Sequence, residues 1–192
     1  REGGSVKRLR FQGQTVKELE EGRGICIDTR LADDRGYGAV HRLTWLQGAP
    51  YVRISTVFEN HSRETAKLEL LSSFSLQGIS PWVEGDCHDQ ITVHRIRGRW
   101  SEEGRLESQT MEELQLETSW TREAVRCERF GSIGSMPINK YFPFLALEDK
   151  KNHVFWGAQL EAPASWQLEI YRIDDNIAMD GGLADREFGH WM

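Results

Sequence analysis

Residues 52–76 read VRISTVFENHSRETAKLELLSSFSL, and their pattern predicts the fold class. Apolar residues or threonine occupy every second position at the start, with Arg53 and Ser55 between them. Residues 66–76 alternate in the same way against lysine, glutamate and serine. A period of two is typical of a β-strand with one buried face, whereas a helix needs apolar spacings of three and four. Because the polar residues 60–64 form a short turn between the two runs, we expect an antiparallel hairpin.

A second pair of alternating runs lies near the end of the sequence. Residues 154–160 carry an apolar face, and so do residues 166–170, through Trp166, Leu168 and Ile170. The segment 162–164, which reads APA, is a turn, so these runs predict a second hairpin. Few stretches show helical spacing. We therefore expect an all-β protein, an antiparallel two-sheet β-sandwich whose apolar faces pack together.

The sequence of 192 residues contains no internal repeat, low-complexity linker or shift in composition that would mark a domain boundary. A chain of this length can bury one substantial core. We therefore predict a single domain over residues 1–192. No run approaches the roughly 18 apolar residues of a membrane-spanning helix, and the first residues do not read as a signal peptide.

The net charge of −6 argues against nucleic acid as the main partner, because binding to phosphates requires clustered lysine and arginine. Arg95, Arg97 and Arg99 do cluster, but they alternate along an expected strand, and Glu102 and Glu103 follow directly. A solvated strand face accounts for them.

The cysteines and histidines predict neither a metal site nor a bound cofactor. Cys26, Cys87 and Cys127 are odd in number, far apart and without a C-x-x-C spacing, so neither a zinc site nor a disulfide framework is indicated. None of the six histidines has zinc-ligand spacing. Reduced cysteines are the default in a cytoplasmic protein, and a cytoplasmic location is the expectation here.

Adjacent acidic residues raise the question of a glycosidase, because glycoside hydrolysis uses a pair of carboxyl groups. The candidate pairs are Asp33 with Asp34, Asp86 with Asp89, and Asp174 with Asp175. Acidic pairs are common in turns, and none of these has a signature that would separate an acid from a nucleophile. The residues alone assign no catalytic group.

The segment 180–191 reads DGGLADREFGHW and combines features that a plain loop does not need. Two adjacent glycines allow a forced turn, three charged residues follow, and Phe188 and Trp191 supply apolar area. Two interpretations remain open at this point. Trp191 either completes the core from a strand or belongs to an interface.

The second half of the sequence resembles the N-terminal region of glycoside hydrolase family 36, the α-galactosidases. The motifs occur in this order: HRIR (94–97), WSEEGR (100–105), SW (119–120), ERFG (128–131), GSMP (134–137), FPF (142–144), WGAQL (156–160), SWQLE (165–169) and GGLADREFGHW (181–191). Weaker similarity at Asn60 and residues 70–76 extends the resemblance back to about residue 51.

The resemblance implies a β-supersandwich, similar in fold to the galactose mutarotases, in front of a (β/α)₈ barrel that carries two catalytic aspartates. A barrel needs roughly 200 residues of alternating strand and helix, and this sequence shows strands throughout. We therefore expect the N-terminal domain of a longer multidomain enzyme, without catalytic residues of its own. The implied partners are the barrel, its α-galactoside substrate and further copies of the enzyme.

The expected contacts follow from the same resemblance. Arg186, His190 and Trp191 are predicted to lie at a domain or subunit interface near the substrate site, and Trp82 and Asp86 are candidates for sugar contact. A free-standing galactoside-binding module is the alternative. An aldose 1-epimerase, which uses a histidine acid and a glutamate base, ranks last, because the sequence shows no such pair.

Overall fold

The computed structural model describes residues 7–79, 87–117, 125–134, 138–161, 164–173, 176–184 and 190–191. Almost all the regular structure in these ranges is β-strand. The strands are β1 (Arg10–Glu18), β2 (Gly24–Ala32), β3 (Tyr37–Leu46), β4 (Val52–Asn60), β5 (Lys67–Leu68), β6 (Leu70–Leu76), β7 (Ile91–Ile96), β8 (Leu106–Thr110), β9 (Val125–Ser132), β10 (Phe144–Asp149), β11 (Val154–Gln159), β12 (Trp166–Ile173), β13 (Asn176–Ala184) and β14 (His190–Trp191). A single turn of 3₁₀ helix, η1 (Glu20–Gly22), follows β1.

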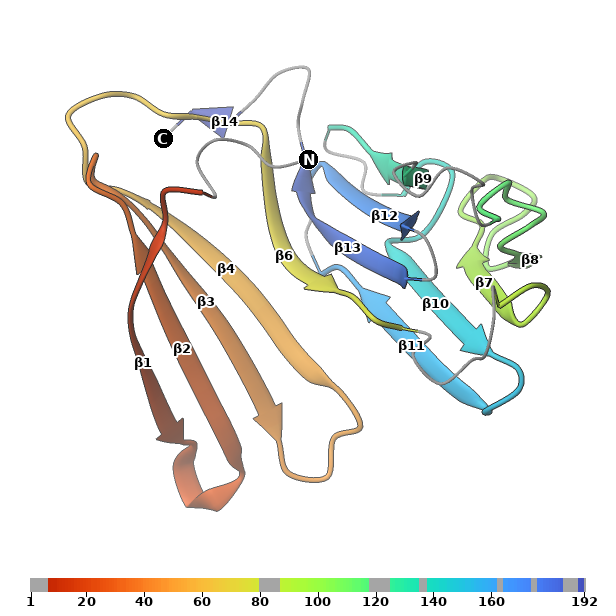
Figure 1. Cartoon of the computed structure of the whole chain (residues 1–192), viewed down its shortest axis with the longest axis horizontal. Coiled ribbons are helices and arrows are strands. Elements are labelled where there is room, and N and C mark those ends of the chain that lie inside the picture. The colour runs from red at the N-terminus through yellow and green to blue at the C-terminus, as the bar shows by residue number, and fades with distance from the viewer. Residues whose placement is uncertain are drawn as a thin grey trace. The chain divides into compact units, whose positions relative to one another are not determined.

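The chain divides into two compact units. Unit 1 comprises Arg1–Phe74 and Arg186–Met192, and unit 2 comprises Ser75–Asp185. Figure 1 shows the strands of both units, most of them with their labels. The expectation that the whole chain is one domain stays a prediction.

Unit 1 is built on a four-stranded antiparallel sheet in the order β1-β2-β3-β4. The register places Ile27, Leu43 and Ile54 in one row across the sheet, so their side chains share a face. In the next row, on the opposite face, Asp28 lies beside Arg42 and accepts two hydrogen bonds from its guanidinium, of 2.6 and 2.8 Å. The alternation read from the sequence therefore separates an apolar from a polar face.

Unit 2 is a sandwich of antiparallel strands. One sheet has the order β11-β10-β7-β8, and the other has the order β6-β13-β12-β9, with β6 continuing from unit 1. The core side chains come from alternate positions and are at most 1% exposed: Ile91, Val93, Leu145, Leu147, Leu168 and Ile170. Burial of each such side chain stabilises the fold by about 2 kcal/mol.

Aromatic contacts surround the ring of Phe130 in unit 2. This ring, on β9, meets Trp166 of β12 edge to face, with 5.9 Å between the ring centroids. It also meets Tyr141, which precedes β10, at 5.3 Å. Such edge-to-face pairs stabilise a core by about 1 kcal/mol beyond the area that they bury.

The predicted all-β, antiparallel sandwich class is confirmed, but both predicted hairpins are wrong. Strand β4 pairs with β3, whereas β6 is the neighbour of β13. Likewise β11 pairs with β10, whereas β12 lies between β13 and β9 in the other sheet. Periodicity shows that a segment is a strand with one buried face. It does not say which strand is its neighbour, and here each of the two predicted strand pairs is divided between different sheets.

No helix within the described ranges has the length and hydropathy to cross a membrane.

Candidate functional site

The structure describes only some of the residues that are predicted to contact a partner or a sugar. Trp82, Asp86 and Arg186 lie outside the described residues. His190 and Trp191 form β14, whose backbone pairs with β5 so that His190 lies opposite Leu68 and Trp191 opposite Lys67. Their side chains lie outside the description, so their predicted role at an interface stays a prediction.

Among the acidic pairs, the structure explains Asp33 as a turn residue. Its Oδ1 accepts hydrogen bonds from the backbone N–H groups of Arg35 and Tyr37, both at 2.9 Å. The Tyr37 N–H, and then the groups of Arg35, hold the pKa of this carboxyl below its ordinary value, against the effect of its burial. An ionised carboxylate that closes the turn between β2 and β3 is structural. Asp86, Asp174 and Asp175 lie outside the described residues.

The expectation of a solvated face at the arginine cluster is wrong for Arg95. This residue is only 4% exposed, because its side chain points into the sandwich of unit 2. Its guanidinium donates hydrogen bonds to Glu128 at 2.7 Å, to Glu107 at 2.7 Å and to Gln109 at 2.6 Å. Because Glu128 belongs to β9, whereas Arg95, Glu107 and Gln109 belong to β7 and β8, the guanidinium joins the two sheets.

Two aromatic rings and a second arginine complete this buried cluster. The Arg95 guanidinium lies over the Tyr141 ring at 4.8 Å and over the Phe130 ring at 5.5 Å. Arg97 lies over the Tyr141 ring at 4.7 Å and forms an ion pair with Glu107. The Tyr141 hydroxyl donates a hydrogen bond to Glu107 at 2.9 Å. Two arginines and two glutamates thus neutralise one another, as buried charges require.

The pKa shifts in this cluster follow from its contacts. Burial alone would raise the pKa of Glu107, but the hydrogen bonds from Tyr141 and Arg97 and the charge of Arg95 lower it below its ordinary value. Burial, followed by the hydrogen bond to ionised Glu107, raises the pKa of Tyr141. Glu107 therefore stays ionised and Tyr141 neutral at physiological pH. Since every charge of this cluster has a partner inside the protein, the cluster links the two sheets of unit 2 and is not an open site.

A signal for the buried position of Arg95 was present in the sequence. Ile91 and Val93 precede it at alternate positions, so a period of two places all three side chains on the same face. The register confirms this, because Val93 pairs with Gln109 and Arg95 with Glu107. The compensating acids lie 12 and 33 residues away in sequence, and periodicity cannot identify them.

A histidine–glutamate pair that the sequence did not reveal lies on the other face of the β7 sheet. His94 Nε2 lies 3.0 Å from Glu148 Oε2, and Nδ1 lies 2.8 Å from Ser108 Oγ. Three adjacent strands, β10, β7 and β8, supply these side chains. Both ring nitrogens are thus within hydrogen-bonding distance of protein atoms. The arrangement is a cross-strand polar ladder.

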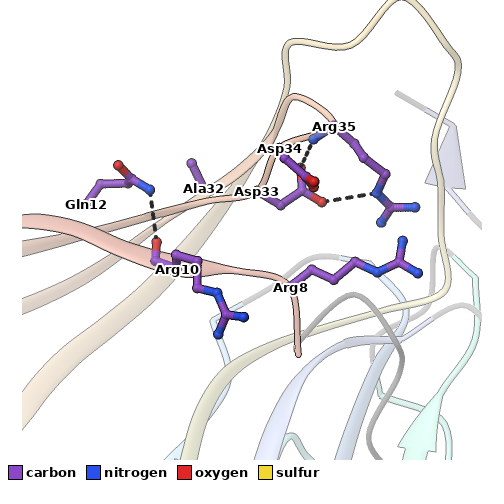
Figure 2. A pocket seen from close by; sticks show the side chains of 7 residues that line it. All are labelled: Arg8, Arg10, Gln12, Ala32, Asp33, Asp34 and Arg35. Carbon is purple, nitrogen blue, oxygen red and sulfur yellow. Dashed lines mark hydrogen bonds and ion pairs between the residues drawn. The ribbon is translucent and has the colours of Figure 1, made fainter.

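A hollow with a volume of about 530 Å³ lies at one end of the unit 1 sheet. Figure 2 shows the residues that line it: Arg8, Arg10, Gln12, Ala32, Asp33, Asp34 and Arg35. The start of β1 contributes one wall, and the turn between β2 and β3 contributes the other. A second hollow of about 440 Å³ shares Arg35 and is lined further by Tyr37 and residues 61–64. Nothing in the sequence marked Arg8 or Arg10 as site residues.

Comparison with known proteins identifies the fold. The chain matches no protein-family model. It matches no curated protein sequence either. Among solved structures, the family 36 α-galactosidase AgaA from Geobacillus stearothermophilus superposes with a TM-score of 0.71 at 16% identity, over 96% of this chain. A variant of that enzyme solved in complex with stachyose gives the same values. The α-galactosidase from Lactobacillus brevis superposes with a TM-score of 0.68 at 14% identity.

The match covers a small part of these enzymes. This chain spans 26% of the Geobacillus chain and 25% of the Lactobacillus chain. At this level of identity the similarity establishes the fold. The resemblance seen in the motifs of the second half is therefore confirmed as a resemblance of fold: the chain has the β-architecture that family 36 α-galactosidases contain over about a quarter of their length.

Proposed function

We propose that this chain is the non-catalytic N-terminal domain of an α-galactosidase-like glycoside hydrolase and supports its catalytic barrel and its oligomer. The observation that carries the proposal is the uneven coverage of the structural match, 96% of this chain against 26% of the enzyme. The all-β elements agree with it, because a (β/α)₈ barrel requires about eight alternating strands and helices. The substrate of the whole enzyme is then a terminal α-galactoside.

The contact with the barrel or a neighbouring subunit is proposed to involve Arg186, His190 and Trp191. Arginine and tryptophan are the residue types that most often anchor interfaces, and a guanidinium can hold a carboxylate through two hydrogen bonds. Trp82 and Asp86 are proposed to contact the sugar. A cytoplasmic location is proposed from the three cysteines, none of which forms a disulfide within the described part of the chain.

The test is to follow the reading frame beyond Met192 and to express its complete product. We expect a continuation with alternating strand and helix patterns, and a product that hydrolyses an aryl α-galactoside. Deletion of residues 1–192 from that product is expected to leave an aggregated or inactive barrel. A reading frame that ends at Met192 would overturn the proposal. Saturable binding of galactose to the isolated chain would then favour the alternative, a free-standing galactoside-binding module.

Substitution of Trp191 by serine tests the proposed interface. If Trp191 lies at an interface, the isolated chain should self-associate less and keep its melting temperature. If it is a core residue, the variant should lose about 3–5 kcal/mol of stability without a change in oligomeric state. Analytical ultracentrifugation and thermal unfolding of the two proteins separate these outcomes.

A further inference from the structure

The hollow at the end of the unit 1 sheet gathers positive charge in a chain whose net charge is −6. Arg8 lies just before β1, and Arg10 and Gln12 are among its first residues, so one short segment supplies all three side chains. Arg10 lies opposite Ala32 in the register, which brings this edge of the sheet next to the turn that carries Arg35. Figure 2 shows the three arginine side chains around the hollow.

Arg35 is held in place by the turn itself. Its Nε pairs with Asp33 Oδ2 at 3.3 Å, and its guanidinium lies over the Tyr37 ring at 5.2 Å. The Asp33 side chain is only 1% exposed, whereas that of Arg35 is 46% exposed. The two terminal nitrogens of Arg35 have no partner among the described residues, so they are free to donate to a ligand. Fixing the side chain beforehand lowers the entropic cost of binding.

The acids near the hollow neutralise its arginines only in part, because the one ion pair among the described lining residues joins Asp33 to Arg35. Arg8 and Arg10 have no ion pair within the described ranges. The carboxylate of Asp33 is occupied by two backbone N–H groups and by Arg35. Asp34 is the remaining acid that lines the hollow. Three guanidinium groups therefore face two carboxylates, one of which is already committed to the turn.

We propose that this hollow binds a small phosphate monoester that carries hydroxyl groups, such as a sugar phosphate. A guanidinium group can donate two parallel hydrogen bonds to the oxygens of a phosphate. Three guanidinium groups favour a ligand that is a phosphate dianion over a ligand that carries one carboxylate. Asp34 and the Gln12 amide can hydrogen-bond to hydroxyl groups at the polar rim. The volume of about 530 Å³ exceeds what inorganic phosphate fills and falls in the usual range for small-molecule sites.

The test is calorimetric titration of the complete 192-residue chain with inorganic phosphate, galactose 6-phosphate, galacturonate and galactose. At low ionic strength, galactose 6-phosphate is expected to bind with a Kd of about 1 mM or tighter. Galacturonate and galactose are expected to bind at least about tenfold more weakly, because charged hydrogen bonds dominate the recognition. Affinity should fall with added salt, and it should rise between about pH 5 and 7.5 as the phosphate loses its second proton.

Variants assign the binding to named residues. The double variant Arg8→Gln/Arg10→Gln is expected to raise the Kd for galactose 6-phosphate about tenfold or more. The double variant Arg8→Lys/Arg10→Lys should raise it by less, because lysine keeps the positive charge but cannot donate the two parallel hydrogen bonds of a guanidinium. Asp34→Asn should tighten the binding of inorganic phosphate. The matched control is Arg53→Gln on β4, which should leave the Kd unchanged. All these side chains are exposed, so circular dichroism should show an unchanged fold.

Three results would overturn the proposal: no saturable binding of galactose 6-phosphate, equal affinity for galacturonate or galactose, or an unchanged Kd in the Arg8→Gln/Arg10→Gln variant. The site and the proposed function are independent, because the titration uses this chain alone and the test of function uses the product of the longer reading frame. Failure of either leaves the other intact.

Discussion

At the scale of single residues, Arg95 is the side chain whose contacts matter most for the stability of the fold. A 4% exposed guanidinium with three hydrogen-bond acceptors and two aromatic rings around it joins the β7–β8 hairpin to β9. Removing one partner from such a cluster leaves the remaining charges with less compensation. The charge of Arg95 therefore stabilises the buried glutamates, and their charges stabilise Arg95.

Substituting Arg95 by methionine tests this dependence. We expect the free energy of unfolding to fall by about 3 kcal/mol, because Glu107 loses a charged partner inside the sandwich. The matched control is Arg105→Gln, whose side chain is 66% exposed and pairs with Glu102 in the same turn. That control should be close to neutral, since exposed ion pairs contribute little. Urea unfolding measures both, and equal stability of the two variants would contradict the structural role of Arg95.

The lowered pKa of Glu107 predicts a pH dependence of stability. A carboxyl group whose pKa is lower in the folded than in the unfolded state stabilises the fold fully above its unfolded value, here near 4.5, and loses that contribution as pH falls through the folded value. The difference in stability between the wild type and Glu107→Gln should therefore be constant near neutral pH and shrink below about pH 4.5. A difference that grows on acidification would contradict the assignment.

At the scale of elements, the sequence predicted strands better than it predicted neighbours. The alternation in residues 52–58, 154–160 and 166–170 correctly predicted strands, because a half-buried strand requires it. The pairing of β6 with β13 and of β12 with β9 depends on contacts between residues far apart in the sequence. Local turn signals favour hairpins, and the chain instead changes sheet after β4 and after β11. The site residues were less predictable still, because Arg8, Arg10 and Arg35 are brought together only by strand pairing.

The close approach of β9 and β12 gives a test at this scale. Gly131 lies opposite Gln167, and a Cβ atom at Gly131 would collide with the backbone carbonyl oxygen of Trp166. Because backbone cannot move aside as a flexible side chain can, Gly131→Ala should cost about 1–3 kcal/mol. The control Gly13→Ala in β1 adds its methyl group into open space and should be nearly neutral. Urea unfolding of both variants provides the comparison, and a neutral Gly131→Ala would show that the two strands are less tightly packed.

At the scale of the whole molecule, the number of cooperative units is open to measurement. Contacts divide the chain into two compact units, whereas the uniform composition predicts a single domain. If the chain is one domain, tryptophan fluorescence and far-ultraviolet circular dichroism should report the same unfolding transition in urea. Two separated transitions would show that the units unfold independently.

Hydrolysis of an aryl α-galactoside by the isolated 192-residue chain tests the central claim most directly. The chain has the fold of about a quarter of an α-galactosidase, and its best-defined acid cluster is neutralised inside the sandwich. The account predicts no release of the aryl group above the rate in buffer at any pH from about 4 to 9, the range over which carboxyl and imidazole catalysts change protonation state. Saturable turnover that disappears when Asp86 or Asp185 is replaced by asparagine would contradict it, because the chain would then contain a catalytic site of its own.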